Sequence, residues 1–217
     1  MKVPAKTILL TGFTPFAGET INPSWQAARA LDGKIIEGHR VVAVELPTTF
    51  DGTPALLRRA LRSTNPRVAI ATGLAGGREG ISLERVAINL IDARIPDNTG
   101  AQPVDAPVVR NGPAAYFSTL PIKAALRELQ KAGISAHVSQ TAGTYVCNQV
   151  FYTLMHATKR RKSLRAGFVH VPYLPEQAAR HNAQGMPLDE MIRALEIIVR
   201  AALTTRVDAR THAGAES

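Results

Sequence analysis

The sequence predicts an α/β fold in which helices cover both faces of a central sheet. Short runs rich in Val and Ile alternate along the chain with segments of helical periodicity, and this alternation is typical of that class. A length of 217 residues fits one domain with one core. The chain is 45% hydrophobic and 20% charged. It has no apolar run near the roughly 20 residues of a membrane span, so the composition is that of a globular protein.

Five elements are expected in the first third of the chain. They are strands over 7–13, 40–47 and 67–73 and helices over 22–31 and 54–62. Asn22 and Pro23 mark the start of the first helix, because Asn caps a helix well and Pro fits its first turn. The strand over 67–73 (RVAIATG) is almost continuously apolar, which indicates burial on both faces.

The rest of the chain continues the alternation, with one exception. Expected are strands over 81–92, 134–140 and 166–172 and helices over 120–133, from Cys147 to the basic run at 159, and over 188–203. Pro121 fits the first turn of its helix and Gly133 its end. The exception is the segment 94–119, which is rich in Pro, Gly and Asn and has no period. A segment of this length is either a functional loop or an interaction surface, and the sequence leaves both open.

The net charge of +9 raises the question of nucleic-acid binding. The densest basic stretch is KRRKSLR, Lys159–Arg165, but it follows a helical segment, and cations are favoured where a helix ends. No RNA-binding aromatic motif and no paired Cys/His finger spacing accompanies it. We therefore expect a solvated surface and no nucleic-acid or membrane partner.

The ends of the chain and its single cysteine bear on location and boundaries. One cysteine excludes an intramolecular disulfide and a Cys-rich zinc site. The opening MKVPAKTILLTGF has no small-residue cleavage site, so it predicts a first strand rather than a signal peptide, and we expect a cytoplasmic protein. The catalytic domain is expected to cover residues 1–203. Residues 204–217 are expected to form a flexible C-terminal tail, since RVDARTHAGAES has no periodicity.

Cys147, in the stretch TAGTYVCN, is the first candidate for chemistry. It is placed in the first turn of its helix, with Thr144 as a plausible N-cap and Gly143 allowing a sharp turn. The positive helix end lowers the pKa of a thiol, and its free N–H groups suit a developing oxyanion. The alternative is that Cys147 is a small buried core residue.

A nucleophilic cysteine needs a base, and His170 is favoured among six histidines. It lies near the carboxyl end of a strand stopped by Pro172, where open α/β sheets bind ligands; a hydrogen-bonded core histidine is the alternative. Glu84 would share an apolar face with Val86 in an extended strand. A carboxylate there needs a partner, unless that face is wet. Together the three could form a Cys, His, acid set.

Six blocks of sequence closely resemble the pyroglutamyl peptidase I family, also called pyrrolidone carboxyl peptidases. The blocks are TGFTPFAGETINPSW, GLAGGREGISLERVAIN, DARIPDNTGAQP, GPAAYFSTLPIKA, VSQTAGTYVCN and VHVPYLPEQ, in the family's order up to about residue 203. The resemblance implies a single three-layer α/β/α domain around a twisted mixed sheet, often assembled into tetramers. It also implies that Cys147, His170 and Glu84 are the family's catalytic residues.

The resemblance extends to substrate binding. It implies that Phe13 and Phe16 close around the lactam ring of the substrate, which suits a small neutral ring because flat apolar walls bind it best. Tyr145 and Val146, beside the cysteine, and Arg94, in the DARIPDN block, are the other expected binding residues. Three positions depart from the family: Leu74 stands where Gln is common, Ala17 in place of a Gly of PFGG, and Gln140 in place of the Asn of SNTAG. We expect these departures to change affinity rather than to remove activity.

The resulting expectation is a cysteine exopeptidase that removes an N-terminal pyroglutamyl residue from peptides without metal or organic cofactor. A Cys147 thiolate paired with a His170 imidazolium attacks the carbonyl, Glu84 orients His170, and main-chain N–H groups hold the oxyanion. Two alternatives stay open. One is a phosphorolytic or ester-cleaving enzyme that binds phosphate at GLAGGREG with Arg78, and the other is a nucleic-acid binder driven by net charge.

Overall fold

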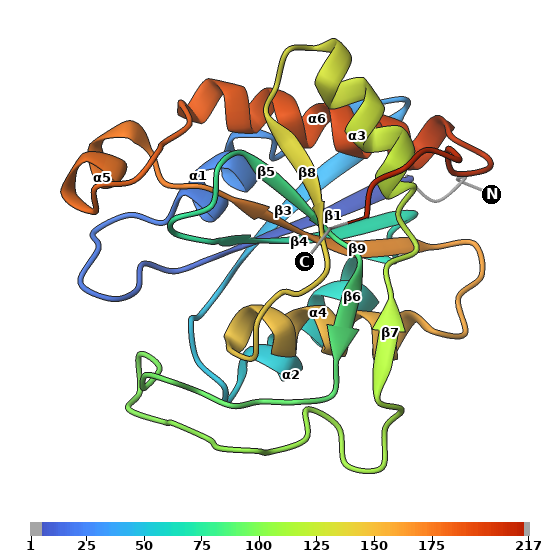
Figure 1. Ribbon diagram of the computed structural model, residues 1–217. Coiled ribbons are helices and arrows are strands. Elements are labelled where there is room, and N and C mark those ends of the chain that lie inside the picture. The colour runs from blue at the N-terminus through green and yellow to red at the C-terminus, as the bar shows by residue number, and fades with distance from the viewer. Residues whose placement is uncertain (1–5, 215–217) are drawn as a thin grey trace.

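The computed structural model describes residues 6–214 and has a seven-stranded mixed sheet at its centre (Figure 1). The strand order is β2-β3-β1-β4-β9-β5-β8. The strands are β1 (Thr7–Phe13), β2 (Ile35–Ile36), β3 (His39–Leu46), β4 (Val68–Leu74), β5 (Ile81–Glu84), β8 (Ala136–Ser139) and β9 (Arg165–Val171). β3, β1, β4 and β9 are parallel, β5 is antiparallel to β9, and β8 is parallel to β5. The expected single α/β domain with a mixed sheet is confirmed.

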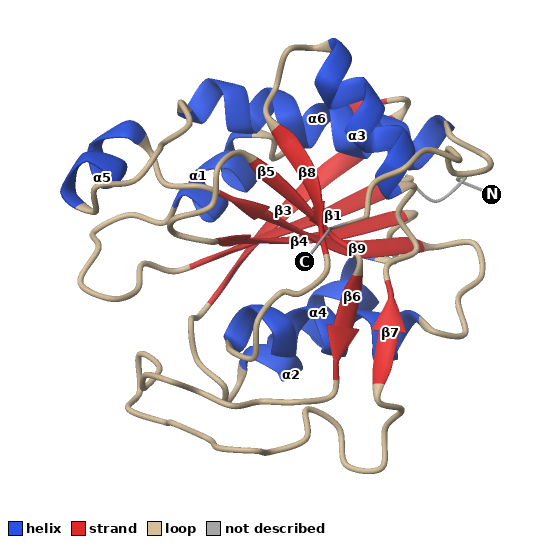
Figure 2. Cartoon of the chain, in the orientation of Figure 1, coloured by secondary structure: helices blue, strands red, loops and turns tan. Residues whose placement is uncertain are grey.

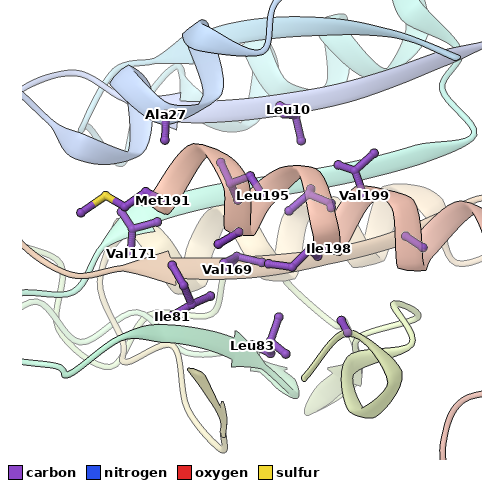
Figure 3. Packing of buried hydrophobic residues seen from close by; sticks show 14 of the residues in the cluster. Leu10, Ala27, Ile81, Leu83, Val169, Val171, Met191, Leu195, Ile198 and Val199 are labelled. Carbon is purple, nitrogen blue, oxygen red and sulfur yellow. The ribbon is translucent and has the colours of Figure 1, made fainter. Parts of the chain in front are cut away.

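Helices cover both faces of the sheet (Figure 2). On one face lie α1 (Pro23–Ala30), α3 (Ile122–Lys131) and α6 (Leu188–Thr204), and on the other α2 (Thr53–Thr64) and α4 (Val146–Thr158), with the short α5 (Pro175–Arg180) following β9. Figure 3 shows Leu195 and Ile198 of α6 above Val169 of β9. Each side chain of this kind stabilises the fold by about 1.5–3 kcal/mol when fully buried.

The first helix begins as its sequence predicts. The Asn22 side chain accepts a hydrogen bond from the Ser24 N–H at 3.1 Å, and Pro23 occupies the first turn. The amide of Asn22 also donates to the Thr14 carbonyl at 3.0 Å. This one residue therefore fixes both the helix start and the loop that enters it.

The strand expected over 81–92 is wrong, because the chain breaks at Arg85. Residues before the break form β5, inside the main sheet, and those after it form β6 (Val86–Ile88), which pairs with β7 (Ala115–Phe117) in a separate two-stranded sheet. All four β5 residues are buried, because the strand lies between β9 and β8 with both faces covered. Glu84 is therefore buried, as expected of an apolar face, and the alternative of a wet face does not hold; it does not share that face with Val86, which lies in the other sheet.

The segment 94–119 contains β7 and otherwise no helix or strand. Its strand β7 packs near α4, and in the view of Figure 1 the rest of the segment passes below α2. The buried carboxylate of Asp97 accepts hydrogen bonds from the N–H groups of Phe50, Thr99 and Ala101, so the segment is fastened to the body of the domain.

The described part of the expected C-terminal tail, residues 205–214, contacts the domain. The Asp208 carboxylate accepts hydrogen bonds from the Lys123 and Ala124 N–H groups at the start of α3, a helix whose own N-cap makes no side-chain bond. Flexibility of 204–217 stays a prediction, and residues 1–5 and 215–217 lie outside the described part. None of the helices within residues 6–214 has the length and hydropathy required to cross a bilayer.

Candidate active site

The first turn of α4 holds Cys147 at the carboxyl edge of the sheet. Gly143 takes the left-handed conformation (φ 76°) that the turn into the helix requires. Tyr145, not Thr144, is the N-cap residue; the Thr144 hydroxyl instead donates to the Asp92 carbonyl at 2.7 Å. The Asn148 amide bonds to Ile88 on β6 in both directions. The start of the helix is thus fixed by the segment 88–92, which begins at the end of β6.

Glycine at position 73 makes room for the sulfur. A Cβ added to Gly73 would lie 2.8 Å from Cys147 Sγ and 2.9 Å from Cζ of Phe168. In the register of β4 and β9, Gly73 is the partner of His170. The sulfur, on α4, and His170, on β9, therefore both lie next to Gly73 of β4.

Glu84 lies behind the imidazole. The Nδ1 atom of His170 and Oε1 of Glu84 are 2.7 Å apart, and the two side chains are 4% and 0% exposed. Burial on its own would raise the pKa of Glu84, but the hydrogen bond from His170 and the positive charge of Arg78 bring it below its usual value. An ionised carboxylate accepts hydrogen bonds only, so Nδ1 carries the proton and Nε2 is left as the basic nitrogen.

Arg78 completes the charged group, and sequence reasoning named it only as a phosphate binder. Its Nη1 donates to the same Glu84 oxygen at 2.6 Å and to the Ser139 hydroxyl at 3.1 Å, and its Nη2 donates to the Thr141 carbonyl at 2.8 Å. Both ends of the guanidinium are engaged by the protein. This arrangement weakens the hypothesis that GLAGGREG is a phosphate site.

The electrostatics around Cys147 differ from the expected ion pair. Burial, with a smaller effect of the Glu84 charge, raises the pKa of the Cys147 thiol to about 12. Burial also lowers the pKa of His170, against the opposing effect of Glu84. Among residues 6–214 no hydrogen bond joins Cys147 to His170. Burial therefore favours a neutral Cys147 thiol and a neutral His170 imidazole.

A cavity of about 490 Å³, including its open mouth, leads to the cysteine. It is lined by Phe13, Phe16, Glu19, Ile21, Asn22, Thr48, Leu74, Tyr145, Val146 and Cys147. Four of the five residues expected to bind substrate are in this set, whereas Arg94 is exposed and does not line the cavity. The Tyr145 ring lies 5.4 Å from that of Phe16 and 5.1 Å from that of Phe50 between centroids, so the entrance has aromatic walls.

Several lining residues escaped the sequence reasoning. Asn22 was recognised only as a helix cap, and Thr48 gave no signal. Glu19 accepts hydrogen bonds from Gln177 and Arg180 and lies 2.9 Å from Nε2 of His181; these hydrogen bonds lower its pKa to about 2. The carboxylate thereby ties the loop that carries Phe16 to α5.

The three departures from the family pattern lie in different surroundings. Leu74 lines the cavity, so the exchange of a polar for an apolar side chain there faces the substrate site. Ala17 has φ 54°, in the left-handed region that favours glycine. Gln140 is exposed and does not line the cavity.

The basic run at 159–165 lies at the opposite edge, where β4 and β9 begin. There a groove of about 940 Å³, here called the basic groove, is lined by Arg58, Leu61, Arg62, Asn65, Ala157, Thr158 and Arg161. It is formed by the C-terminal ends of α2 and α4. Within residues 6–214, no group of three or more His, Cys, Asp or Glu side chains is placed to hold a metal ion.

Comparison with known proteins identifies the family. The model of the family described as pyroglutamyl peptidase matches residues 6–205. The chain belongs to the pyroglutamyl peptidase family. Pyrrolidone-carboxylate peptidases from Cupriavidus pinatubonensis and Chromobacterium violaceum are 54% and 55% identical to it, each over 96% of this chain and 98% of the relative. The crystal structure of pyroglutamyl peptidase I from Bacillus amyloliquefaciens superposes with a TM-score of 0.93 at 46% identity, covering 96% of this chain and all of that one. As a member of this family of cysteine peptidases, the chain is an enzyme.

Proposed function

We propose that this peptidase removes the N-terminal pyroglutamyl residue of peptides with Cys147 as nucleophile, His170 as base and Glu84 as the residue that orients the base. The observation that carries the proposal is the buried pair of Glu84 and His170, 2.7 Å apart, on the strand next to the glycine that accommodates the sulfur. Buried carboxylates are costly unless partnered, and such pairs concentrate at functional sites.

The cavity supports a neutral cyclic substrate group. Phe13, Phe16 and Tyr145 supply flat apolar walls, which bind an uncharged lactam ring without desolvating a charge. A free N-terminus carries an ammonium group that these walls would leave without a partner. The one carboxylate of the lining, Glu19, is already bound by donors from α5. Selectivity for the blocked N-terminus follows from this arrangement.

The chemistry proceeds through an acyl-enzyme. The Cys147 thiol transfers its proton to Nε2 of His170 as the sulfur attacks the carbonyl carbon that joins the lactam residue to the next residue. The C–N bond then breaks, the leaving amine takes the proton from His170, and a thioester remains. Water attacks the thioester, His170 accepts its proton, and the pyroglutamate leaves as the thiol re-forms. The high thiol pKa favours proton transfer during attack over a preformed thiolate.

The oxyanion of each tetrahedral intermediate faces the start of α4. The first N–H groups of a helix have no intrahelical acceptor, and Cys147 is in that first turn. Donors fixed in this way stabilise developing negative charge. Arg94 is exposed and away from the cavity lining, so the proposal gives it no step.

Two further properties are proposed from the family resemblance: assembly into a homotetramer and a cytoplasmic location. Light scattering coupled to size-exclusion chromatography tests the first, because a tetramer of a 23.3 kDa chain elutes far from a monomer. A monomer that retains full activity would remove oligomerisation from the proposal.

Replacement of the nucleophile tests the proposed function. Cys147→Ala should lower release of a chromogenic amine from a pyroglutamyl conjugate by more than about 10⁴-fold, since loss of a nucleophile removes the covalent route. Cys147→Ser should fall nearly as far, because a hydroxyl is far less acidic. Thermal unfolding of both variants should match the unsubstituted protein, and activity should survive a metal chelator. Residual activity within tenfold in Cys147→Ala would rule the mechanism out.

A further inference from the structure

Arg78 bonds to the base-orienting carboxylate and to the turn that precedes the nucleophile. It lies in the loop between β4 and β5 and is 28% exposed. One guanidinium nitrogen bonds to Glu84, and the other to the Thr141 carbonyl. Thr141 opens the turn that leads to α4, where its hydroxyl also accepts a hydrogen bond from the Gly143 N–H at 3.0 Å. The guanidinium therefore connects Glu84, which binds His170, to the turn that leads to Cys147.

The two carboxylate oxygens of Glu84 differ in their hydrogen-bond partners. Oε1 accepts from Nη1 of Arg78 at 2.6 Å and from Nδ1 of His170 at 2.7 Å, whereas Oε2 is buried without a hydrogen-bond partner in the described part of the chain. The cation and the imidazole thus share one oxygen. In surroundings of low dielectric, a cation at that oxygen offsets the negative charge that the imidazole experiences.

We propose that Arg78 is a positioning residue of the peptidase reaction, which holds the Glu84 carboxylate and the 139–143 turn in place and limits the basicity that Glu84 confers on His170. The inference rests on the proposed catalytic function of Cys147, His170 and Glu84. Arg78 is absent from the cavity lining, so its effect reaches the substrate only through these residues.

In the described part of the chain, few charged or titratable groups surround His170. Glu84 faces it from β5, Arg78 from the β4–β5 loop and Cys147 from α4, while β4 presents Gly73. On the far side of β5, His137 of β8 lies 3.1 Å from the hydroxyl of Ser82, the β5 partner of His170. The Arg78 charge opposes protonation of His170, and it lowers the pKa of Cys147 against the larger effect of burial.

Removal of the Arg78 charge should raise the pH at which activity is lost on the acid side. Without that charge, His170 holds a proton more tightly, and the neutral base is lost at a higher pH. In Arg78→Gln, we expect the acid limb of kcat/KM for a pyroglutamyl chromogenic amide to move up by about one pH unit. We expect kcat at the optimum to fall about tenfold, as for other residues that support catalytic groups, with KM nearly unchanged. In Arg78→Lys the charge remains but the forked contact is lost, so kcat falls and the acid limb stays in place.

The controls separate this inference from the proposed function. Arg62→Gln, in the basic groove, makes the same change in net charge and should keep both kcat and the acid limb of the unsubstituted protein. An unsubstituted protein without activity, or an active Cys147→Ala variant, would refute the proposed function itself. Given Cys147-dependent activity, an Arg78→Gln variant whose acid limb does not move overturns the inference, whether or not kcat falls. If Arg78→Gln does not fold, Arg78→Lys decides: a displaced acid limb or an unchanged kcat overturns it.

Discussion

At the carboxyl edge of the sheet, a few charged groups lie in contact with one another; at the amino edge of β4 and β9, many lie apart in water. Glu84 and His170 are buried and hydrogen-bonded to each other, and Arg78 donates to the same oxygen of Glu84. In the basic groove, Arg58 and Arg62 are exposed, and within residues 6–214 neither forms an ion pair. At the carboxyl edge the Glu84 carboxylate is desolvated and paired, whereas the cations of the basic groove are solvated.

The difference between the two edges shows how charged residues in a sequence should be interpreted. Cations at the ends of α2 and α4 are stabilised by the negative helix termini and by solvent, so a dense basic run requires no ligand to explain it. A buried carboxylate costs several kcal/mol unless it is paired. An acidic residue in an apolar strand is therefore a stronger functional signal than seven residues of mostly positive charge.

The largest expected effect on this contrast comes from neutralising the buried acid. Glu84→Gln keeps the volume and an oxygen that can accept from His170, but it removes the charge that stabilises the imidazolium. We expect kcat/KM to fall by about 10³–10⁴-fold, as when the acid of a triad is lost. Glu128→Gln, which removes an exposed carboxylate paired with Lys131 on α3, is the matched control and should change activity by less than about twofold. A loss below tenfold in Glu84→Gln would show that burial of the acid serves stability alone.

A methyl group at Gly73 tests whether the close approach of the two strands and the sulfur matters. Gly73→Ala places its Cβ 2.8 Å from Cys147 Sγ and 2.9 Å from Phe168, so the sulfur must shift. A displacement of this size should reduce kcat/KM by about 10²-fold. Gly214→Ala, where a Cβ meets nothing within 4 Å, is the control. Activity of Gly73→Ala within twofold of the unsubstituted protein would contradict the placement of the sulfur.

A smaller effect is expected in the pH dependence of kcat/KM, which reports the surroundings of the buried His170. His170 acts as a neutral base, and burial brings its pKa below the ordinary 6.5. The neutral form therefore persists as the pH falls to 6.5, and kcat/KM should decline only below that value. Near-UV circular dichroism at each pH separates titration from unfolding. An acid limb with its midpoint above pH 6.5 would mean that Glu84 outweighs burial.

The smallest effect is expected at the basic groove. The double variant Arg58→Ser/Arg62→Ser should retain kcat/KM within about twofold, because surface charges far from a site interact weakly with it at physiological salt. Oligonucleotide binding by the unsubstituted protein, measured by fluorescence anisotropy, should be absent at micromolar protein. Tight, salt-sensitive binding that the double variant loses would restore the nucleic-acid alternative.

The sequence predicted the local structure correctly where interactions between neighbouring residues determine it. The caps of α1, the apolar run of β4 and the turn at Gly143 follow from the preferences of the residues themselves. The same reasoning failed at 81–92, since a chain that leaves one sheet for another breaks its alternation at Arg85. Arg78 was missed as part of the site because its loop gives no sign of which partners it meets.

The sequence by itself determined the α/β class, the family, and the three residues proposed for catalysis, because periodicity, turn residues and motif order are written in short segments. Only the tertiary structure decided that β5 lies antiparallel beside β9, so that Glu84 reaches His170, that Gly73 accommodates the sulfur, and that Arg94 stays outside the cavity. These outcomes depend on contacts between residues far apart in the chain and on the water excluded when they meet. The sequence shows which thiols and carboxylates can ionise, but the pKa of each is set by the residues that surround it in the folded protein.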